Sequence, residues 1–89
     1  MTKPIISIVI TTKNEEKHIR NCIESIQKQT FPRDQIEIIV VDNHSTDKTK
    51  KIAREYTPHF FTKGPERSAQ RNLGAKKSHG IYYMYLDIL

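Results

Sequence analysis

The spacing of four apolar runs constrains the fold of this chain most strongly. The runs are short and rich in β-branched residues, and they cover residues 5–10, 36–41, 59–62 and 81–86. The segments between them are 17 to 25 residues long, and each carries a helical pattern. A hairpin needs about two to five connecting residues, whereas parallel strands need a crossover of about a dozen or more. The sequence therefore predicts alternating strands and helices, βαβαβαβ, around a mostly parallel sheet.

Helix signals occur in all three intervening segments. The first helix is expected after Asn14, a plausible N-cap residue, and its inward face is an apolar stripe. That stripe consists of Ile19, Cys22, Ile23 and Ile26. The second helix is expected over residues 47–56 with Ser45 or Thr46 as its cap, and the third over about residues 67–78. Helices packed on both faces of the sheet make this a three-layer, Rossmann-like α/β fold.

Polar residues stand where the apolar runs end. Thr11 and Thr12 follow the first run, Asp42 follows the second, and Asp87 follows the fourth. The carboxyl ends of parallel strands share one edge of the sheet, which is where open α/β sheets bind ligands. Carboxylates at this edge could bind a ligand hydroxyl, a base N–H or a metal ion. The structural alternative for each aspartate is a helix cap or an Asx turn.

Two arginines one helical turn apart begin the third predicted helix. Arg67 and Arg71 could reach a diphosphate at the strand edge, helped by the positive end of the helix. The alternative is an ion pair of Arg67 with Glu66, or a solvated helix face. The glycines form neither a Gly-x-Gly-x-x-Gly nor a Gly-x-x-x-x-Gly-Lys pattern. Rossmann dinucleotide binding and P-loop chemistry are therefore not expected.

Charge and composition limit the class of partner. Fifteen basic and ten acidic residues give a net charge of +5, which favours an anionic partner. The lysines are expected on exposed helix faces without interleaved aromatic residues, so nucleic acid is not an expected partner. No run is long enough to span a membrane. We expect a cytoplasmic protein, with peripheral contact at the cytoplasmic face of the membrane left open.

Cysteine and histidine usage adds little chemistry. Cys22 is the single cysteine, so an internal disulfide is excluded. The four histidines show no metal-ligand spacing, and no serine or cysteine has the sequence context of a nucleophile. His44 stands two residues after Asp42, where a turn position is the expected role.

Four sequence blocks together carry a resemblance to a known family. They are residues 5–16 (IISIVITTKNEE), residues 37–47 (EIIVVDNHSTD), the Arg71-Asn72-x-Gly74 motif and residues 80–87 (GIYYMYLD). In this order they resemble the family 2 glycosyltransferases, which have the GT-A fold. The resemblance implies that residues 1–89 form the N-terminal half of that fold. It also implies a nucleotide-diphosphate sugar donor, held at the strand edge, and an unidentified glycan, lipid or protein acceptor.

The resemblance also implies roles for individual residues. The nucleotide pocket would be lined by Thr11, Thr12, Asn14 and Glu15. Asp42 would accept a hydrogen bond from the base, and Arg71 and Asn72 would lie near the base or the diphosphate. Asp87 would be the first acid of the family's Asp-x-Asp motif, near the ribose and the metal. An arginine fork matches phosphate oxygens, which agrees with the role of Arg71 and extends to Arg67.

Two departures from the family pattern reduce the expected activity. Leu89 occupies the position of the second Asp-x-Asp acid and offers no oxygen to the Mg²⁺ or Mn²⁺ that the family uses. The resemblance places the acceptor site and the general base in a later part of the domain, beyond residue 89. The chain is therefore expected to be a truncated domain that binds a donor but is inactive by itself.

Two functions of other classes stay open at this point. The first is a non-catalytic interaction domain whose basic helix faces bind a partner or an anionic membrane surface. The second is a receiver-like phosphoacceptor at Asp42, although such a domain would carry more acids after its first strand than Glu15 and Glu16.

Overall fold

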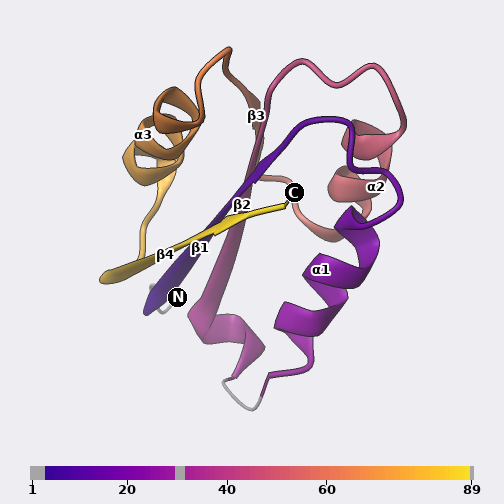
Figure 1. The fold of residues 1–89 in the computed structure, drawn as a ribbon. Coiled ribbons are helices and arrows are strands. Elements are labelled where there is room, and N and C mark those ends of the chain that lie inside the picture. The colour runs from indigo at the N-terminus through magenta and orange to yellow at the C-terminus, as the bar shows by residue number, and fades with distance from the viewer. Residues whose placement is uncertain (1–3, 30–31, 89) are drawn as a thin grey trace.

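The computed structural model describes residues 4–29 and 32–88, and it confirms the predicted parallel sheet. The sheet contains β1 (Ile6–Thr12), β2 (Ile36–Asp42), β3 (Phe60–Thr62) and β4 (Tyr82–Asp87) in the order β3-β2-β1-β4 (Figure 1). All three pairings are parallel. The register aligns Thr12 with Asp42 and Thr11 with Asp87, so the predicted polar strand ends do share one edge.

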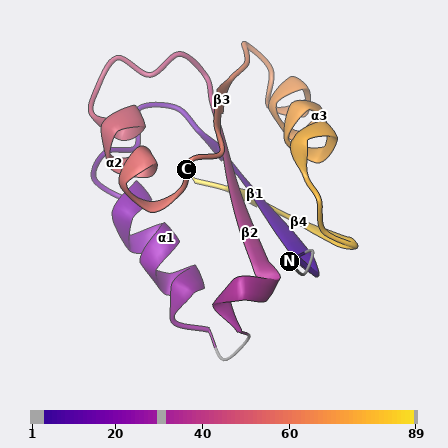
Figure 2. The same ribbon diagram turned by 180° about the vertical axis from the view of Figure 1, so that it is seen from behind.

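Three helices and one short 3₁₀ segment connect the strands. The helices are α1 (Ile19–Gln27), α2 (Thr49–Tyr56) and α3 (Arg67–Lys77), and the 3₁₀ segment η1 covers Arg33–Gln35. Helices α1 and α2 lie on one face of the sheet and α3 lies on the other, which gives the expected three layers (Figures 1 and 2). None of these helices is long and apolar enough to cross a bilayer.

Alternating side chains on β1 and β2 build two cores. On the α1 and α2 face, Ile8, Ile10 and Val40 pack against the apolar stripe of α1 and against Ala53 of α2. On the α3 face, a smaller cluster consists of Val9, Ile39 and Val41, with Phe61 and Leu73 packed against it. Strands buried on both faces explain why their sequence is a nearly continuous apolar run.

Helix α3 lies unusually close to the sheet because of one glycine. A Cβ atom at Gly74 would lie only 2.2 Å from Cγ1 of Val9. No real side chain tolerates that separation, so only glycine permits this approach. The glycine therefore fixes the distance between α3 and β1.

A buried carboxylate ties the start of β4 to the centre of the sheet. Glu37 accepts hydrogen bonds from Ser7 Oγ (2.8 Å) and from the backbone N–H of His79 (2.8 Å), and it lies 2.7 Å from Nδ1 of His79. Burial by itself raises the pKa of Glu37, but the hydrogen bonds from His79 and Ser7 outweigh it and hold that pKa below its ordinary value. Glu37 is thus a structural anchor for the segment that leads into β4.

Two predicted helix starts are wrong. α1 begins at Ile19 instead of directly after Asn14, and α2 begins at Thr49 instead of Asp47. The backbone of Asn14 has φ 53°, a left-handed conformation that asparagine tolerates and that interrupts a helix. The predicted caps also serve other partners: Asn14 Oδ1 accepts from the Thr46 N–H, and the Ser45 hydroxyl donates to Asp42. The sequence also predicts that the first helix frays near Thr30, a position outside the described residues.

Candidate functional site

The strand order creates a crevice at the carboxyl ends of β1 and β4. The chain first adds β2 and β3 on one side of β1 and then crosses to the other side to add β4. Open α/β sheets bind ligands where the strand order reverses in this way. Thr11 and Asp87 face each other across this point, and the Thr11 hydroxyl donates a hydrogen bond to Asp87 Oδ1.

Arginines of α3 complete the polar group at this edge. Arg71 donates a hydrogen bond to Oδ2 of Asp87, and Nη1 of Arg67 lies 3.9 Å from the same oxygen. Burial by itself raises the pKa of Asp87, but the Thr11 hydroxyl and the two guanidinium groups hold it below the ordinary range. Asp87 is therefore ionised at neutral pH, and both arginines stay beside it. The sequence left open an ion pair of Arg67 with Glu66. Among the described residues Arg67 instead lies beside Asp87, and no ion pair joins it to Glu66.

A hollow of about 480 Å³ opens next to this group. It is bounded by the ends of β1 and β2, by the first turn of α3 and by the segment after β4. The lining residues are Thr11, Thr12, Lys13, Glu15, Asn43, Pro65, Arg67, Gln70 and Ile88. The hollow thus combines one basic side chain from α3 with hydroxyl and amide groups from the strand ends.

Asp42 lies behind the wall of this hollow. Its side chain is buried, with the residue only 3% exposed. Oδ1 accepts from the hydroxyls of Thr12 (2.7 Å) and Ser45 (2.5 Å), and Oδ2 accepts from the Ser45 N–H (2.7 Å). Asp42 therefore fixes Thr12 and the loop after β2, and that arrangement leaves its oxygens poorly placed to accept a phosphoryl group. That Asp42 also accepts a hydrogen bond from a base stays a prediction.

Loops after β1 and β2 are tied together above the strand ends. The backbone N–H of Asn14 donates to Ser45 Oγ (2.7 Å), and the Glu15 N–H donates to the Thr49 hydroxyl (2.8 Å). Asp47 accepts from Thr49 and from the Glu16 N–H, and these bonds outweigh burial and lower its pKa. These cross-links hold the two loops as one wall of the hollow.

The structure brings most of the predicted site residues together. Thr11, Thr12, Glu15 and Arg67 line the hollow. Arg71 and Asp87 lie beside it, joined to its lining through Thr11 and Arg67. Asp42 supports it from behind. Asn14 and Asn72 are exposed and do not belong to the lining, so their expected contact with a ligand stays a prediction.

Besides Pro65, which lies in the turn before α3, four lining residues were not predicted. They are Lys13, Asn43, Gln70 and Ile88. Lys13 and Asn43 directly follow predicted strand ends, so their position in the sequence could have indicated them. Gln70 stands four residues before Gly74 on the inward face of α3, and no local sequence pattern indicated its role. Ile88 has no such signal in the sequence.

The described residues do not fit a divalent metal by themselves. Mg²⁺ requires about six oxygen ligands in octahedral geometry. At this edge Asp87 is the predicted metal ligand, and its two oxygens already accept hydrogen bonds from Thr11 and Arg71. Within residues 4–29 and 32–88 there is no group of three His, Cys, Asp or Glu side chains that could hold a metal. Leu89, at the position of the second acid, lies outside the described residues.

Comparison with known proteins identifies the family. The model of glycosyl transferase family 2 matches residues 7–87, which is nearly the whole chain. The chain belongs to glycosyl transferase family 2. The predicted resemblance and the GT-A type of fold are therefore confirmed.

Individual members of family 2 are similar in sequence and in structure. The chain is 33% identical over 93 residues to the glycosyltransferase AglE of Haloferax volcanii, covering 97% of this chain and 31% of AglE. It superposes on residues of TarS 1–349 of S. aureus in complex with UDP-GlcNAc with a TM-score of 0.77 and 32% identity, covering 93% of this chain and 26% of that one.

A further similar structure is the mannosyltransferase PcManGT from Pyrobaculum calidifontis, solved in complex with GDP-Man and Mn²⁺. Its TM-score is 0.66 at 25% identity, over 82% of this chain and 24% of that one. This family-2 chain thus spans about a third or less of the length of the relatives that it matches.

Proposed function

We propose that the hollow at the ends of β1, β2 and α3 binds a nucleotide-diphosphate sugar, the donor for transfer of the sugar to an acceptor. The observation that carries this proposal is the convergence of Arg67, Arg71, Asp87 and Thr11 on one rim of a polar hollow at the reversal of strand order. Cationic forks and hydroxyls suit the diphosphate and the ribose, respectively.

The charged groups at the hollow suit an anionic ligand that also carries hydroxyl groups. Arg67 stands at the first position of α3, an 11-residue helix, so its guanidinium and the helix N-terminus act on the same side of the hollow. Asp87 balances the two arginines, and because each carboxylate oxygen can accept a second hydrogen bond, it can also accept from hydroxyl groups of the ligand. A ligand with a diphosphate next to a ribose meets both needs.

Relatives support this class of ligand. TarS was solved with UDP-GlcNAc and PcManGT with GDP-Man and Mn²⁺, and both share the fold of this chain. We extend the nucleotide-sugar class to this chain and leave the sugar open. Because the described residues do not fit a divalent metal by themselves, the proposal derives no step through one; Mg²⁺ or Mn²⁺ belongs to the proposed whole enzyme.

Sugar transfer to an acceptor is proposed for a whole enzyme of this family. In that reaction the acceptor hydroxyl gives up its proton to a base, its oxygen bonds to the anomeric carbon, and the bond from that carbon to the diphosphate breaks, so that the nucleoside diphosphate leaves. Within the described residues, the carboxylate beside the hollow is held by two arginines and a threonine, which suits binding better than proton abstraction. We therefore propose that these 89 residues bind the donor without transferring its sugar.

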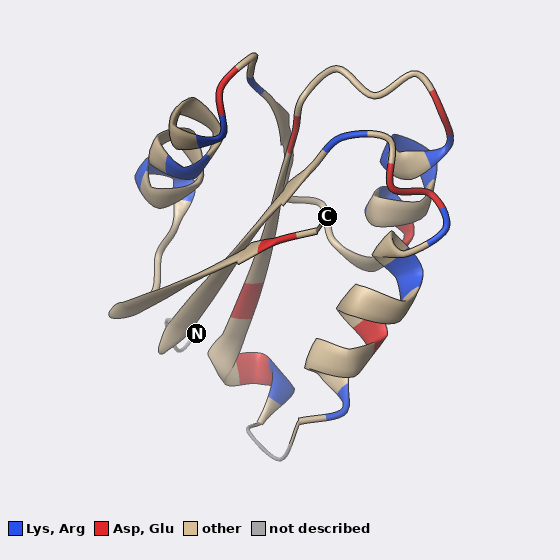
Figure 3. Ribbon diagram, viewed as in Figure 1, with Lys and Arg blue, Asp and Glu red and all other residues tan. Residues whose placement is uncertain are grey.

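The alternative role, a basic surface for a partner or an anionic membrane, has weaker support. The exposed lysines within helices are divided between α2 and α3, which cover opposite faces of the sheet (Figure 3). Lys50 and Lys51 belong to α2, and Lys76 and Lys77 belong to α3. A division of this kind gives two small cationic faces instead of one continuous surface.

Calorimetric titration of the folded chain with UDP and GDP sugars tests the proposal. We expect saturable binding that weakens at least tenfold in Arg71→Met, because a charge-assisted hydrogen bond to phosphate contributes about 1.5–3 kcal/mol. Arg54→Met, an exposed arginine of α2, is the matched control and should bind as the wild type does. Equal affinities in both variants, or no saturable binding by a folded sample, would contradict the proposal.

Asp42→Asn tests the separate prediction about the base. If Asp42 accepts a hydrogen bond from the ligand, the variant loses about 1.5–3 kcal/mol of binding free energy. If Asp42 only supports Thr12 and Ser45, the thermal stability falls while the affinity of the remaining folded protein changes little. The two measurements on one variant therefore separate the two roles.

A further inference from the structure

Gln70 has a fixed amide group at the back of the hollow. The residue is 4% exposed and stands on the inward face of α3. Its Nε2 donates hydrogen bonds to two backbone carbonyls, Val41 O at 2.8 Å and Thr12 O at 3.2 Å. These carbonyls belong to the carboxyl ends of β2 and β1, so one side chain of α3 bridges both strands.

The orientation of this amide follows from its partners. An amide nitrogen carries two donor hydrogens, and here both are directed to carbonyl oxygens. A flipped amide would place Oε1 against two oxygens that can only accept, and no hydrogen bond would remain. Nε2 therefore faces the strands, and Oε1 points away from them.

Oε1 of Gln70 is left as a free acceptor. None of the residues described, 4–29 and 32–88, donates a hydrogen bond to it. Gln70 lines the hollow together with Thr12, Asn43 and Pro65. Oε1 is not among the described side-chain atoms that are buried without a partner, so it is open to the hollow. A ligand that covers it without supplying a donor leaves it unpaired, and a ligand that places an N–H there should bind about tenfold more tightly.

Packing of α3 keeps this acceptor in place. Gly74 lies one turn further along α3 and brings the helix against Val9. The two contacts, Gly74 on β1 and Gln70 on both strand ends, prevent the helix from sliding along the sheet. A rigid acceptor discriminates between ligands better than a mobile one because it cannot turn to offer its N–H instead.

We propose that Gln70 selects the nucleobase of the donor by accepting a hydrogen bond from a ring N–H. This inference rests on the proposed function and deepens it. Uracil and guanine carry such an imino N–H, whereas cytosine and adenine carry a lone pair at the corresponding ring nitrogen. An acceptor fixed against that lone pair repels it, so the hollow takes uridine or guanosine diphosphates and rejects the other two.

Ligands alone can test this assignment on the unaltered chain. Calorimetry with UDP, GDP, CDP and ADP keeps the diphosphate constant and changes only the base. At least one of UDP and GDP should bind tenfold or more tightly than CDP and ADP. Methylation of the ring nitrogen of the better ligand, as N3-methyl-UDP or N1-methyl-GDP, should weaken binding by a similar factor.

Variants then attribute the effect to Gln70. Gln70→Met removes the acceptor while keeping an unbranched side chain, and it should bind the parent nucleotide and its N-methyl analogue equally. Ser68→Ala, at an exposed position of the same helix, is the control and should keep the preference. Should Gln70→Met fail to fold by circular dichroism, the N-methyl comparison is made in Asp42→Asn: a preference that persists there supports Gln70, and one that disappears assigns the ring N–H to Asp42 and overturns the role of Gln70.

The outcomes separate this inference from the proposed function. If all four nucleotides and the N-methyl analogue bind with equal affinity, the hollow binds diphosphates but the role of Gln70 is overturned. If CDP or ADP binds best, the role is overturned as well. If no nucleotide binds to the folded chain, the proposed function fails and this inference fails with it.

Discussion

Strands β2 and β4 have nearly the same sequence pattern and opposite environments. Both are apolar runs that end in an aspartate, and both were predicted as strands of a parallel sheet. In β2, the side chains of Ile39, Val40 and Val41 are 0% exposed. In β4, the residues from Tyr82 to Leu86 are 38% to 64% exposed.

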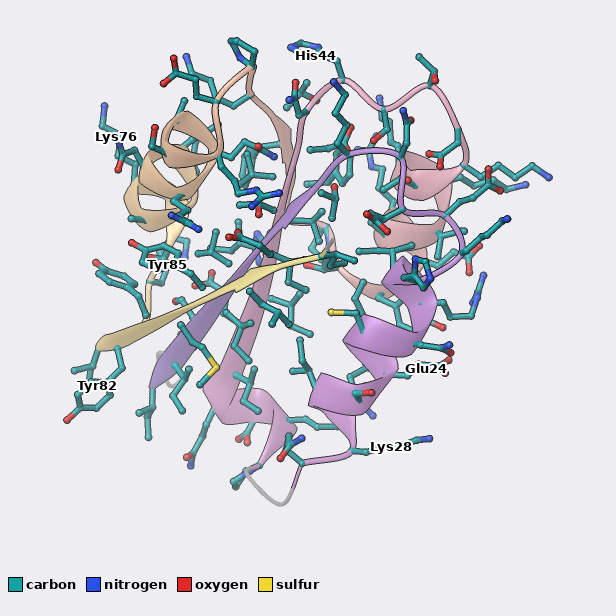
Figure 4. The ribbon with its side chains drawn as sticks, viewed as in Figure 1. Glu24, Lys28, His44, Lys76, Tyr82 and Tyr85 are labelled. Atoms are coloured by element: carbon teal, nitrogen blue, oxygen red, sulfur yellow. The ribbon has the colours of Figure 1, made fainter. Side chains whose placement is uncertain are left out.

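Neighbouring elements account for this difference. β2 lies between β1 and β3 with helices on both faces, whereas β4 pairs only with β1 among the described strands. Figure 4 shows Tyr82 and Tyr85 on opposite sides of β4, so neither face of the strand is covered as β2 is. Edge strands with exposed apolar side chains are sites of association.

The largest expected effect contrasts one central position of each strand. Ile39→Ala should lower the free energy of unfolding by about 2–5 kcal/mol, because it removes buried apolar groups and leaves a cavity. Met84→Ala is the matched substitution in β4, where Met84 is 55% exposed, and it should cost less than about 1 kcal/mol. Urea unfolding measures both values. Similar losses in the two variants would mean that β4 is buried in solution.

The next largest effect on stability is expected at Glu37, which anchors the segment that leads into β4. Glu37→Gln should cost about 1.5–3 kcal/mol at pH 7, because it weakens hydrogen bonds from Ser7 and His79 to a charged acceptor. The sign of the pH effect follows from the lowered pKa. The stabilisation is complete above the unfolded-state value and is lost as the pH falls through the folded-state value.

Thermal unfolding between about pH 7 and pH 3 measures this contribution. The wild type should lose stability progressively below about pH 5, where Asp87 and Asp47 contribute in the same direction because their pKa values are also lowered. Glu37→Gln should show a shallower decline. A decline as steep as that of the wild type would mean that Glu37 is not an anchor.

A substitution at Gly74 tests how closely α3 packs against β1. Gly74→Ala should destabilise the fold by about 1–3 kcal/mol, because the added Cβ would lie 2.2 Å from Val9 Cγ1 and the helix would have to move outward. In an exposed helix position the same change stabilises by up to about 1 kcal/mol. An increase in stability would therefore contradict the close approach of α3 to β1.

Tyr83→Lys gives the smallest effect on stability and acts on self-association. Tyr83 is 53% exposed, so the substitution should change the free energy of unfolding by less than about 0.5 kcal/mol. A charge on an edge strand opposes pairing with another strand. Sedimentation velocity over a concentration series should show less association than for the wild type. If association is unchanged, copies of the chain associate through a surface that does not include Tyr83.

Much of the fold could be predicted from the sequence because strand spacing and helix periodicity are local signals. The run lengths and the connections specified a parallel sheet, and the register then brought Thr11, Asp42 and Asp87 to one edge. The helix starts could not be predicted from capping residues, since Asn14 and Ser45 use their polar atoms to join two loops. That choice depends on tertiary contacts that no local pattern encodes.

The site was predicted in part for the same reason. Residues that follow a strand could be found by position, and Thr11, Thr12, Arg67 and Asp87 gather as expected. Gln70 could not be found, because a polar residue on an inward helix face has a role only once its partners on β1 and β2 are known. The exposure of β4 likewise depends on which elements surround it, which is a property of the assembled sheet.

Chemical-shift mapping of the ¹⁵N-labelled chain with UDP-GlcNAc and GDP-mannose tests the central claim most directly. We predict saturable shifts at the backbone amides of Thr12, Lys13, Asn43 and Gln70, which surround the hollow, with little change in α2. Shifts confined to the exposed lysines of α2, or no saturable shifts in a folded spectrum, would contradict a nucleotide-sugar site at the ends of β1 and β2.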